Sequence, residues 1–306
     1  MTRRLNLILL ILMLVFGLPS YWFLLDNSGA TLPAKPIPIA ELRRLAAAIP
    51  GEAPYAVEVE RAAFRRVPGD LLVAGSGIKR KLVGYMAFRL LVRGGRSVMI
   101  ESGITPKIAA ASGAEQFNLS AQARIDRALD LAGLILVTHE HPDHLGALVA
   151  HGGSALLQAA WLNPRQLPPA ALAAKLGWHG AMPPPRLNGL APQAVAPGVV
   201  VIPAPDSHTP GSQLIYVRLA DGHELLFAGD NASFAQNWQQ LRGRSRLVET
   251  WFAPENRAEV FAWLKTIRAW KAQAPGLLVV PGHDWEWLAD SANKTGVRIG
   301  FSPIAG

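Results

Sequence analysis

The sequence predicts an α/β fold in which two β-sheets pack face to face with helices outside, preceded by one apolar N-terminal helix. Two observations predict it. Short apolar runs of strand length alternate with helical segments through residues 56–306, an order typical of layered α/β domains. Each main cluster of histidine and aspartate follows directly after such a run. Strand ends are rigid positions from which loops can hold a site.

The composition narrows the class of protein. With 306 residues the chain can form one large domain or two small ones, and only 17% of its residues are charged, which excludes a disordered chain. It has no cysteine. Disulfides, thiolate zinc sites and a cysteine nucleophile are therefore excluded.

The net charge of +8 comes from scattered basic residues, with small clusters at 65–66, 79–81 and 242–246. No nucleic-acid-binding motif overlaps these clusters, so we interpret them as a solvated basic surface and expect no nucleic-acid partner. Attraction to anionic lipid headgroups is the second interpretation.

The N-terminus has the pattern of a signal-anchor. Residues 1–4 contain Arg3 and Arg4, and residues 5–25 carry no charge, long enough for a transmembrane helix. Basic residues favour the cytoplasmic side. We therefore expect a single-pass protein of a bacterial inner membrane, with residues 1–4 cytoplasmic and the rest of the chain after the helix in the periplasm. The alternative is a secreted chain cleaved near Ala30, after the small residues 28–30.

The rest divides into a linker at 26–55 and one large domain at 56–306. The linker is rich in Pro and Gly to residue 38, and a short helix is expected at 39–49. Gly94 and Gly95 predict a hairpin. Ser120 is expected to cap a helix that Gly133 ends, and residues 151–198 are expected to form a Pro-rich excursion over the surface. Strands are predicted at 71–75, 85–92, 97–103, 199–208, 213–219, 224–230 and 277–284, and helices at 120–133, from Leu145, and at 255–273.

The sequence "THEHPDH" at 138–144 concentrates metal-binding side chains after the apolar run "LILV". Three later strands end in further candidates of the same kind. Imidazole and carboxylate together suit zinc or a similar first-row divalent ion. The candidate metal ligands are His139, His141, Asp143, His144, His208, Asp230 and His283.

Seven ligands are too many for one ion but suit two ions if an aspartate bridges them. Alternation along the loop lets His139 and His141 bind one ion, while Asp143 and His144 bind the other. His208 and His283 would complete the two sets, and Asp230 is the candidate bridge. Glu140 is expected to point away from the ions. The remaining histidines, His151, His179 and His223, are expected to be ordinary surface or core residues.

Two such ions predict hydrolysis. They lower the pKa of a shared water and clamp the attacking oxygen, so that a metal-bound hydroxide can attack a carbonyl or phosphoryl centre. Asp143 lies near enough in sequence to orient that hydroxide. Asp143 and Asp230 are therefore the candidate catalytic residues. Zinc is the expected ion, although the same ligands tolerate manganese, iron or cobalt.

At these residues the chain resembles the metallo-β-lactamase-fold hydrolases. The family pattern H-x-H-x-D-H matches residues 139–144, and the later motifs match "SHTPGS", "FAGD" and "PGHD", with Glu101 where the family's early strand usually ends in aspartate. The resemblance covers roughly residues 67–290. It implies a four-layer αββα sandwich with two ions at one edge. It also implies that His139, His141 and His208 bind one ion, that Asp143, His144 and His283 bind the other, and that Asp230 bridges them.

The motifs look most similar to the glyoxalase II and N-acyl homoserine lactonase branch, with "HTPGSQLIYV" and "GHDWEW" nearest to the lactonases. This resemblance implies hydrolysis of a small-molecule lactone or (thio)ester, with or without an acyl chain. Lactonases often place a tyrosine three residues after the bridging aspartate, where this chain has Ser233. Either the hydrogen-bond donor to the substrate comes from elsewhere or the substrate differs. Trp161, Trp178 and Trp238 are expected to line an apolar mouth.

Three alternatives remain open. The first is a phosphodiesterase on the same fold, and the second is an oxidoreductase of the persulfide dioxygenase type with a single iron. The third is a non-catalytic, membrane-tethered module. The oligomeric state is not predicted.

Overall fold

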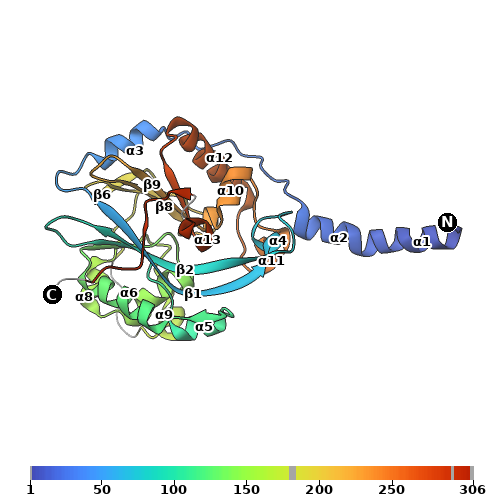
Figure 1. The fold of residues 1–306 in the computed structure, drawn as a ribbon, viewed down its shortest axis with the longest axis horizontal. Coiled ribbons are helices and arrows are strands. Elements are labelled where there is room, and N and C mark those ends of the chain that lie inside the picture. The colour runs from blue at the N-terminus through green and yellow to red at the C-terminus, as the bar shows by residue number, and fades with distance from the viewer. Residues whose placement is uncertain (1, 179–183, 291–292, 304–306) are drawn as a thin grey trace.

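The computed structural model describes residues 2–178, 184–290 and 293–303. Two β-sheets lie face to face, helices cover both outer faces, and one long helix projects from the domain (Figure 1). The predicted four-layer αββα sandwich and the apolar N-terminal helix are therefore confirmed.

The first sheet has the strand order β11-β1-β2-β3-β5, with β4 paired to β1. Its centre is a long antiparallel hairpin of β1 and β2, and β3 pairs in parallel with β5. Its strands are β1 (Ala56–Pro68), β2 (Arg80–Leu91), β3 (Val98–Ile100), β4 (Gln116–Phe117), β5 (Leu134–Leu136) and β11 (Arg298–Ile299).

The second sheet has the strand order β10-β9-β8-β7-β6. Three successive pairs are antiparallel, and β10 joins β9 in parallel. Its strands are β6 (Gln193–Ala196), β7 (Val199–Pro203), β8 (Gln213–Arg218), β9 (Glu224–Gly229) and β10 (Leu278–Pro281).

Helices cover the outer face of each sheet (Figure 1). The first sheet is covered by α5 (Pro106–Ala111), α6 (Leu119–Leu131), α7 (Pro142–His151), α8 (Ser154–Ala159) and α9 (Ala170–Lys175). The second is covered by α3 (Ile39–Ala46), α10 (Ala235–Gln240) and α12 (Arg257–Gln273). Four shorter helices lie in connecting loops: α4 (Gly69–Leu72), η3 (Asp230–Ala232), α11 (Arg246–Trp251) and α13 (Trp285–Ala289).

Period-two alternation builds the layers. On β7, Val199 and Val201 belong to the core between the two sheets. Val200 and Ile202 point the other way, into the core that α12 covers. Successive side chains on a strand point to opposite faces, so a strand buried on both faces consists of apolar residues throughout. This is why "VVVIP" predicts a central strand.

Several local predictions were wrong. Residues 71–75 form the end of α4 and a turn, because Leu71 and Leu72 lie in the connection between β1 and β2. The side chain of Asn118, not Ser120, caps α6 by accepting from Ala121 N at 3.0 Å. Helix α7 begins at Pro142 instead of Leu145, since proline suits the first helical position. Residues 56–68, for which no strand was predicted, form the 13-residue strand β1.

The N-terminal helix runs through α1 (Arg3–Leu12), η1 (Met13–Gly17), α2 (Leu18–Ser20) and η2 (Tyr21–Leu25). By length and composition it can cross a membrane, and its apolar stretch is not buried. The segment after it lies against the domain. Arg257 donates to Ser28 O at 2.6 Å, and Trp270 donates to Ile37 O at 2.7 Å.

Candidate metal centre

The candidate ligands meet because five strands end at one edge of the sandwich. The chain runs in the same direction through β7, β9 and β10, and β3 is parallel to β5. Two glycines permit the close approach. A Cβ at Gly229, which has a φ of 51°, would lie 2.6 Å from Thr138 Cβ, and one at Gly282 would lie 2.6 Å from Asp230 Oδ1. Only glycine fits such contacts and such a backbone.

One group contains three imidazoles and a carboxylate. His141 Nδ1 lies 3.0 Å from His139 Nε2 and 3.2 Å from His208 Nε2. Asp230 Oδ2 lies 3.4 Å from His208 Nε2. The four ligand atoms all lie within 4.8 Å of one another.

The second group lies next to the first. His144 Nε2 is 3.3 Å from His283 Nε2, and Asp143 Oδ2 is 3.7 Å from the same His283 atom. Asp230 Oδ1 lies 3.1 Å from His283 Nε2. The two oxygens of Asp230 therefore face different groups, so this carboxylate stands between them. All seven candidate ligands come together.

The outer nitrogens of four imidazoles lie beside oxygen atoms of the protein. His208 Nδ1 lies 2.8 Å from Glu255 Oε2, and His283 Nδ1 lies 2.8 Å from Gly84 O. His139 Nδ1 is 3.1 Å from Thr138 Oγ1, and His144 Nδ1 is 3.3 Å from Glu101 Oε1. An acceptor at one ring nitrogen leaves the other as a lone pair that faces the centre, the usual orienting pattern around metal-bound histidine.

This donor set fits cations. In the first group ring nitrogens face one another, since His141 Nδ1 lies at hydrogen-bond distance from both His139 Nε2 and His208 Nε2. Such contacts repel unless a positive charge lies between them. A tetrahedral zinc site with ordinary bond lengths places neighbouring ligand atoms ~3.3 Å apart. The spacings of 3.0 to 3.4 Å in the first group match that value.

Burial and neighbouring charges set the protonation of the ligands. Burial, with the other imidazoles, holds the pKa of His139 well below its usual value and lowers the pKa of His141 to about 4. Burial alone would raise the pKa of Asp230, but His283 and Arg244 hold it well below the usual range. The Asp230 carboxylate is therefore ionised and His139 and His141 are neutral at pH 7, the forms that bind a metal. Burial alone would lower the pKa of His144 and His283, but Glu101 and Asp143 raise that of His144 to about 10 and Asp230 raises that of His283, so a cation bound there would displace protons from these two rings.

Arg244 is a buried cation behind the site, and it corrects the interpretation of residues 242–246 as solvated surface. It is 6% exposed. Its Nη2 lies 2.8 Å from Asp230 Oδ2 and donates to Ser233 Oγ at 2.5 Å. Its Nη1 pairs with Glu255. Arg244 thus orients two carboxylates. One is Asp230, which stands between the two groups of ligands, and the other is Glu255, the partner of His208.

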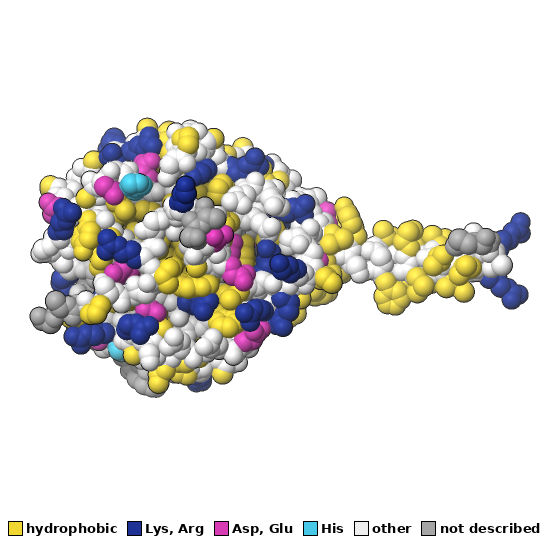
Figure 2. Space-filling model, in the orientation of Figure 1, with side chains coloured by type: hydrophobic (Ala, Val, Ile, Leu, Met, Phe, Trp, Pro, Cys, Tyr) yellow, Lys and Arg dark blue, Asp and Glu magenta, His cyan; other side chains and the backbone are white. Residues whose placement is uncertain are grey.

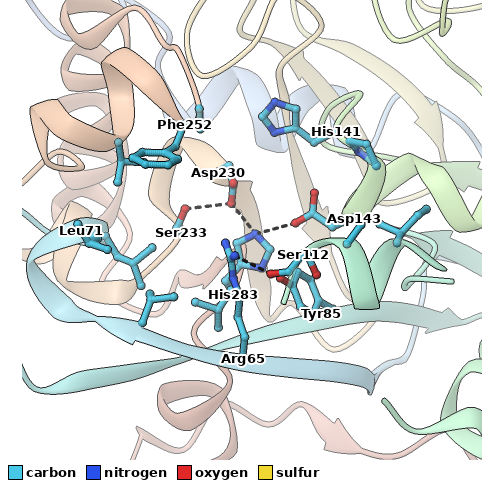
Figure 3. Close-up of a pocket in the computed structure, with 18 of the residues that line it drawn as sticks. Arg65, Leu71, Tyr85, Ser112, His141, Asp143, Asp230, Ser233, Phe252 and His283 are labelled. Carbon is cyan, nitrogen blue, oxygen red and sulfur yellow. Dashed lines mark hydrogen bonds and ion pairs between the residues drawn. The ribbon is translucent and has the colours of Figure 1, made fainter. Parts of the chain in front are cut away.

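A cavity of about 850 Å³ opens beside the two groups. Figure 3 shows Asp143 and His141 on one side of this cavity and Leu71 and Phe252 on the other. Much of the remaining wall is apolar, formed by Val67, Leu72, Val83, Ile108, Ala111, Leu176, Val248 and Ala253.

Tyr85 also lines this cavity. Its ring packs edge-on against His283 with centroids 5.8 Å apart. The side chain is 1% exposed, and among the described residues no group hydrogen-bonds its hydroxyl. Burial raises the pKa of Tyr85 more than the neighbouring Ser112 side chain lowers it, so the hydroxyl keeps its proton, although Ser112 does not make a hydrogen bond of proper geometry with it. Ser233, by contrast, uses its hydroxyl within the protein, since it accepts from Arg244 and donates to Asp230 Oδ1 at 3.0 Å.

The predicted tryptophan mouth is wrong. Trp238 lies in the core under α12, Trp161 packs against the core between the sheets, and Trp178 packs against the core of the first sheet. None of the three lines the cavity. Phe252 lines it instead, because α11 extends over the site.

The other sequence expectations have mixed outcomes. Glu140 does turn away from the ligands, since it accepts from Thr209 Oγ1 at 2.8 Å and from Gly211 N at 3.1 Å. His151 and His223 lie on the surface, and His179 lies outside the described residues. Sequence reasoning missed Tyr85, Arg244 and Glu255. Tyr85 looks like any aromatic residue in a buried strand, and the other two lie in polar loops without a motif.

Solved structures of lactonases are similar to this chain. A quorum-quenching N-acyl homoserine lactone lactonase aligns with a TM-score of 0.56 at 15% identity, covering 78% of this chain and 95% of that one. An N-acyl homoserine lactone hydrolase with N-hexanoyl-L-homoserine at its catalytic metal center aligns at 0.55 and 16%, covering 77% and 96%. The chain adopts the metallo-β-lactamase fold. A mutant of B. thuringiensis AiiA with N-decanoyl-L-homoserine bound at its active site has the same fold, at 0.54 and 15%, covering 77% and 96%.

These comparisons show the fold alone. No protein-family model matches the chain, and no curated protein matches its sequence. Within the metallo-β-lactamase fold, function depends on the site residues and not on the architecture. The seven convergent side chains and the cavity beside them therefore carry any functional argument.

Proposed function

We propose that the chain is a dinuclear metal-dependent hydrolase of lactones or (thio)esters that bear an acyl chain. One observation carries the proposal. The two oxygens of Asp230 face two separate groups of buried ligands, His208 at 3.4 Å and His283 at 3.1 Å. A carboxylate shared in this way is the arrangement that two adjacent cations require.

The seven ligands divide into one set for each ion. His139, His141 and His208 would hold one ion, Asp143, His144 and His283 the other, and Asp230 would touch both. Two divalent ions bound there supply Lewis acidity and lower the pKa of a water between them. Zinc is the ion we propose, since imidazole and carboxylate donors in tetrahedral spacing suit it.

The protein's own groups then position the substrate and move protons. Asp143 is ionised, because His144 and His283 outweigh burial and keep its pKa low. Its carboxylate lines the cavity, so it can accept a proton from the attacking water. Arg244 keeps Asp230 ionised and in place.

Tyr85 is the hydrogen-bond donor that we propose for the substrate. Its hydroxyl is buried, protonated and without a hydrogen-bond partner among the described residues, and it lies at the cavity wall next to His283. A buried donor without a partner costs about 1–3 kcal/mol, and a substrate carbonyl or leaving oxygen would satisfy it. Tyr85 from β2 would thus replace the tyrosine that lactonases often have at the position of Ser233.

A phosphodiester is the second candidate substrate, and one observation favours it. Arg65, Lys107 and Lys175 line the cavity, and within the described part of the chain none of them pairs with a carboxylate. Arg65 Nε is buried without a partner. An anionic substrate would satisfy these cations.

We also propose that the N-terminal helix is retained as a single-pass anchor of the inner membrane, with the catalytic domain in the periplasm. Contacts made by residues that precede the predicted cleavage site support retention. Phe23 packs on Trp251 with ring centroids 5.2 Å apart, and Asp26 pairs with Arg246 at 2.7 Å. Cleavage near Ala30 would remove both contacts, whereas the retained helix keeps them.

Elemental analysis of the purified full chain, followed by a panel of chromogenic lactones, esters, thioesters and phosphodiesters, tests the function. We expect about two zinc ions per chain and turnover of an acyl lactone or ester. One iron per chain would instead indicate the oxidoreductase. Two ions with turnover of phosphodiesters alone would favour the second candidate, and activity unchanged by His141→Ala would indicate a non-catalytic module.

A further inference from the structure

The mouth of the cavity is formed by the two elements that contact the apolar helix. Leu71 and Leu72 of α4 line the cavity on this side, and so do Val248 of α11 and Phe252 just after it. Phe252 is 74% exposed, so it forms part of the rim and not the floor.

The same two elements hold the end of the N-terminal helix. Trp251, next to Phe252, stacks on Phe23 with centroids 5.2 Å apart. Arg246, at the start of α11, lies over the Trp22 ring at 4.1 Å. After α4, Gly75 N donates to Leu24 O at 3.1 Å. A bilayer that contains this helix would therefore lie directly against the mouth of the cavity.

Exposed apolar side chains gather at this end. Outside the N-terminal helix, seven large apolar side chains of the described residues are exposed, and three of them lie in α11, directly after it, or in the loop that follows α4. They are Ile78 at 85%, Trp251 at 62% and Phe252 at 74%. Exposed aromatic and aliphatic residues beside a membrane-spanning helix favour insertion into the interface.

Basic side chains accompany these apolar residues. Lys79 follows Ile78 and is exposed, and Lys107 and Lys175 are exposed on the cavity wall. In the described parts of the chain none of the three has a carboxylate partner. Figure 2 shows Lys and Arg side chains on the part of the domain nearest the projecting helix. Such a surface attracts anionic headgroups.

The orientation of the helix relative to the mouth is fixed by polar contacts. Arg246 Nε donates to Asp26 Oδ2 at 2.7 Å, and Arg257 Nη2 donates to Asp26 O at 3.0 Å. Asn27 Nδ2 donates to Leu241 O at 2.8 Å. These bonds begin one residue after the helix ends, so the domain cannot reorient freely relative to the helix.

We propose that the cavity opens onto the membrane surface and takes its substrate from the bilayer, as an ester whose acyl chain lies in the adjoining leaflet. This inference rests on the proposed hydrolase function and specifies its substrate class. The apolar wall from Phe252 inward holds the acyl chain, and the ligand groups at its inner end reach the carbonyl. Hydrolysis breaks the acyl carbon–oxygen bond. Water gives hydroxyl to the acyl carbon and a proton to the leaving oxygen, so no further reactant is needed.

The first test measures contact with lipid and does not depend on activity. Because the chain has no cysteine, Phe252→Cys and Leu119→Cys each give one labelling site for a fluorophore in the full-length protein. Leu119 is 70% exposed, lies at the start of α6, and serves as the control. In vesicles that carry a lipid-bound quencher, we expect quenching at position 252 and none at position 119. Equal quenching at both positions, or none at 252, would overturn the inference.

The second test measures the substrate. Full-length protein in vesicles with one-third anionic lipid is given a long-chain fluorogenic ester embedded in the bilayer or its short-chain soluble homologue. We expect the double variant Trp251→Ser, Ile78→Ser to lower the ratio of embedded to soluble turnover about tenfold, and Leu119→Ser to leave that ratio unchanged. An unchanged ratio in the double variant would contradict the inference.

The two failures can be told apart. If neither ester is hydrolysed although both ions are bound, the proposed hydrolase function is wrong, and lipid quenching at position 252 still decides whether the mouth faces the bilayer. If both esters are hydrolysed but the label at 252 is not quenched, the hydrolase stands and the membrane-facing mouth does not.

Discussion

The two ends of the sandwich differ in what their loops do. At the end where β3, β5, β7, β9 and β10 finish, the loops bury the candidate metal ligands and the guanidinium of Arg244. At the opposite end the turns are short, with glycines Gly94, Gly198 and Gly222 in the left-handed region. Glycine adopts this backbone conformation without strain, so these residues allow tight turns between neighbouring strands.

Charges are also used differently at the two ends. At the far end Arg43 pairs with Glu224 through two bonds of 2.7 Å, each charge having one opposite partner. At the site end several carboxylates are gathered, with buried Arg244 as the cation that contacts Asp230 and Glu255. Charges arranged one to one serve stability, whereas a surplus of buried negative charge needs a ligand. The far end therefore holds the fold, and the site end is built for cations.

The sharpest test of this contrast is Asp230→Asn. The amide keeps the shape but cannot serve as an anionic bridge, so we expect hydrolysis to fall at least about 10³-fold and the second ion to be lost on elemental analysis. Asp221→Asn is the matched change in a far-end turn, where the Asp221 carboxylate accepts from His223 N. It should change neither quantity. Full activity in the Asp230 variant would remove the distinction between the ends.

Tyr85→Phe and Tyr55→Phe make the same chemical change at opposite ends. Loss of the Tyr85 hydroxyl removes the proposed donor to the substrate, and we expect kcat to fall about 10- to 100-fold with little change in KM and with both ions retained. Tyr55 packs under Arg93 near the far turn, and its variant should keep wild-type kinetics. A drop in metal content with Tyr85→Phe would show that the hydroxyl supports the ligands instead of the substrate.

Gly198→Ala tests the far end for stability. Gly198 has a φ of 75°, and an added Cβ would lie 2.5 Å from Arg218 O. The left-handed backbone alone costs roughly 1–2 kcal/mol, so we expect a loss of at least about that size in the free energy of unfolding by denaturant. Specific activity of the folded fraction should not change. Gly276→Ala is the control, because nothing lies within 4 Å of its added Cβ.

The smallest effect is expected for Glu224→Gln. Hydrogen bonds from Arg43 hold the pKa of Glu224 below its usual value, against the opposing effect of burial. A lowered pKa contributes stability at neutral pH that disappears as the pH falls through the folded-state pKa. Arg43 is partly exposed and screened by solvent, so we expect a loss of less than about 1 kcal/mol at pH 7. The difference should vanish in acid, while Glu41→Gln, in an exposed pair, should show none at any pH.

The layers and the ligands could be predicted because their signals are local. Val199 to Ile202 alternate between two cores, and such a run can only be a central strand. The motif at 138–144 places its histidines and aspartate directly after a strand. Their convergence with His208, Asp230 and His283 then follows from the fact that these strands all end at one edge.

The supporting residues could not be predicted because their signals are not local. Glu255 lies in the loop just before α12 and reaches His208 across 47 positions of sequence. Arg244 lies in a basic loop whose composition suggests solvent. Only the three-dimensional arrangement shows which of several arginines is buried. The same holds for Trp238, because an aromatic residue near a motif in sequence can point into a core.

With the helix retained as the proposed anchor, the contacts of Asp26 would hold the domain in one orientation relative to the membrane plane. A domain joined to its anchor by a flexible linker would sample many orientations and meet its substrate by three-dimensional diffusion. With Arg246 and Arg257 holding the chain where the helix ends, the mouth would stay level with molecules that drift sideways within the leaflet. Encounter would then become a two-dimensional search, governed by the density of substrate per unit area of membrane.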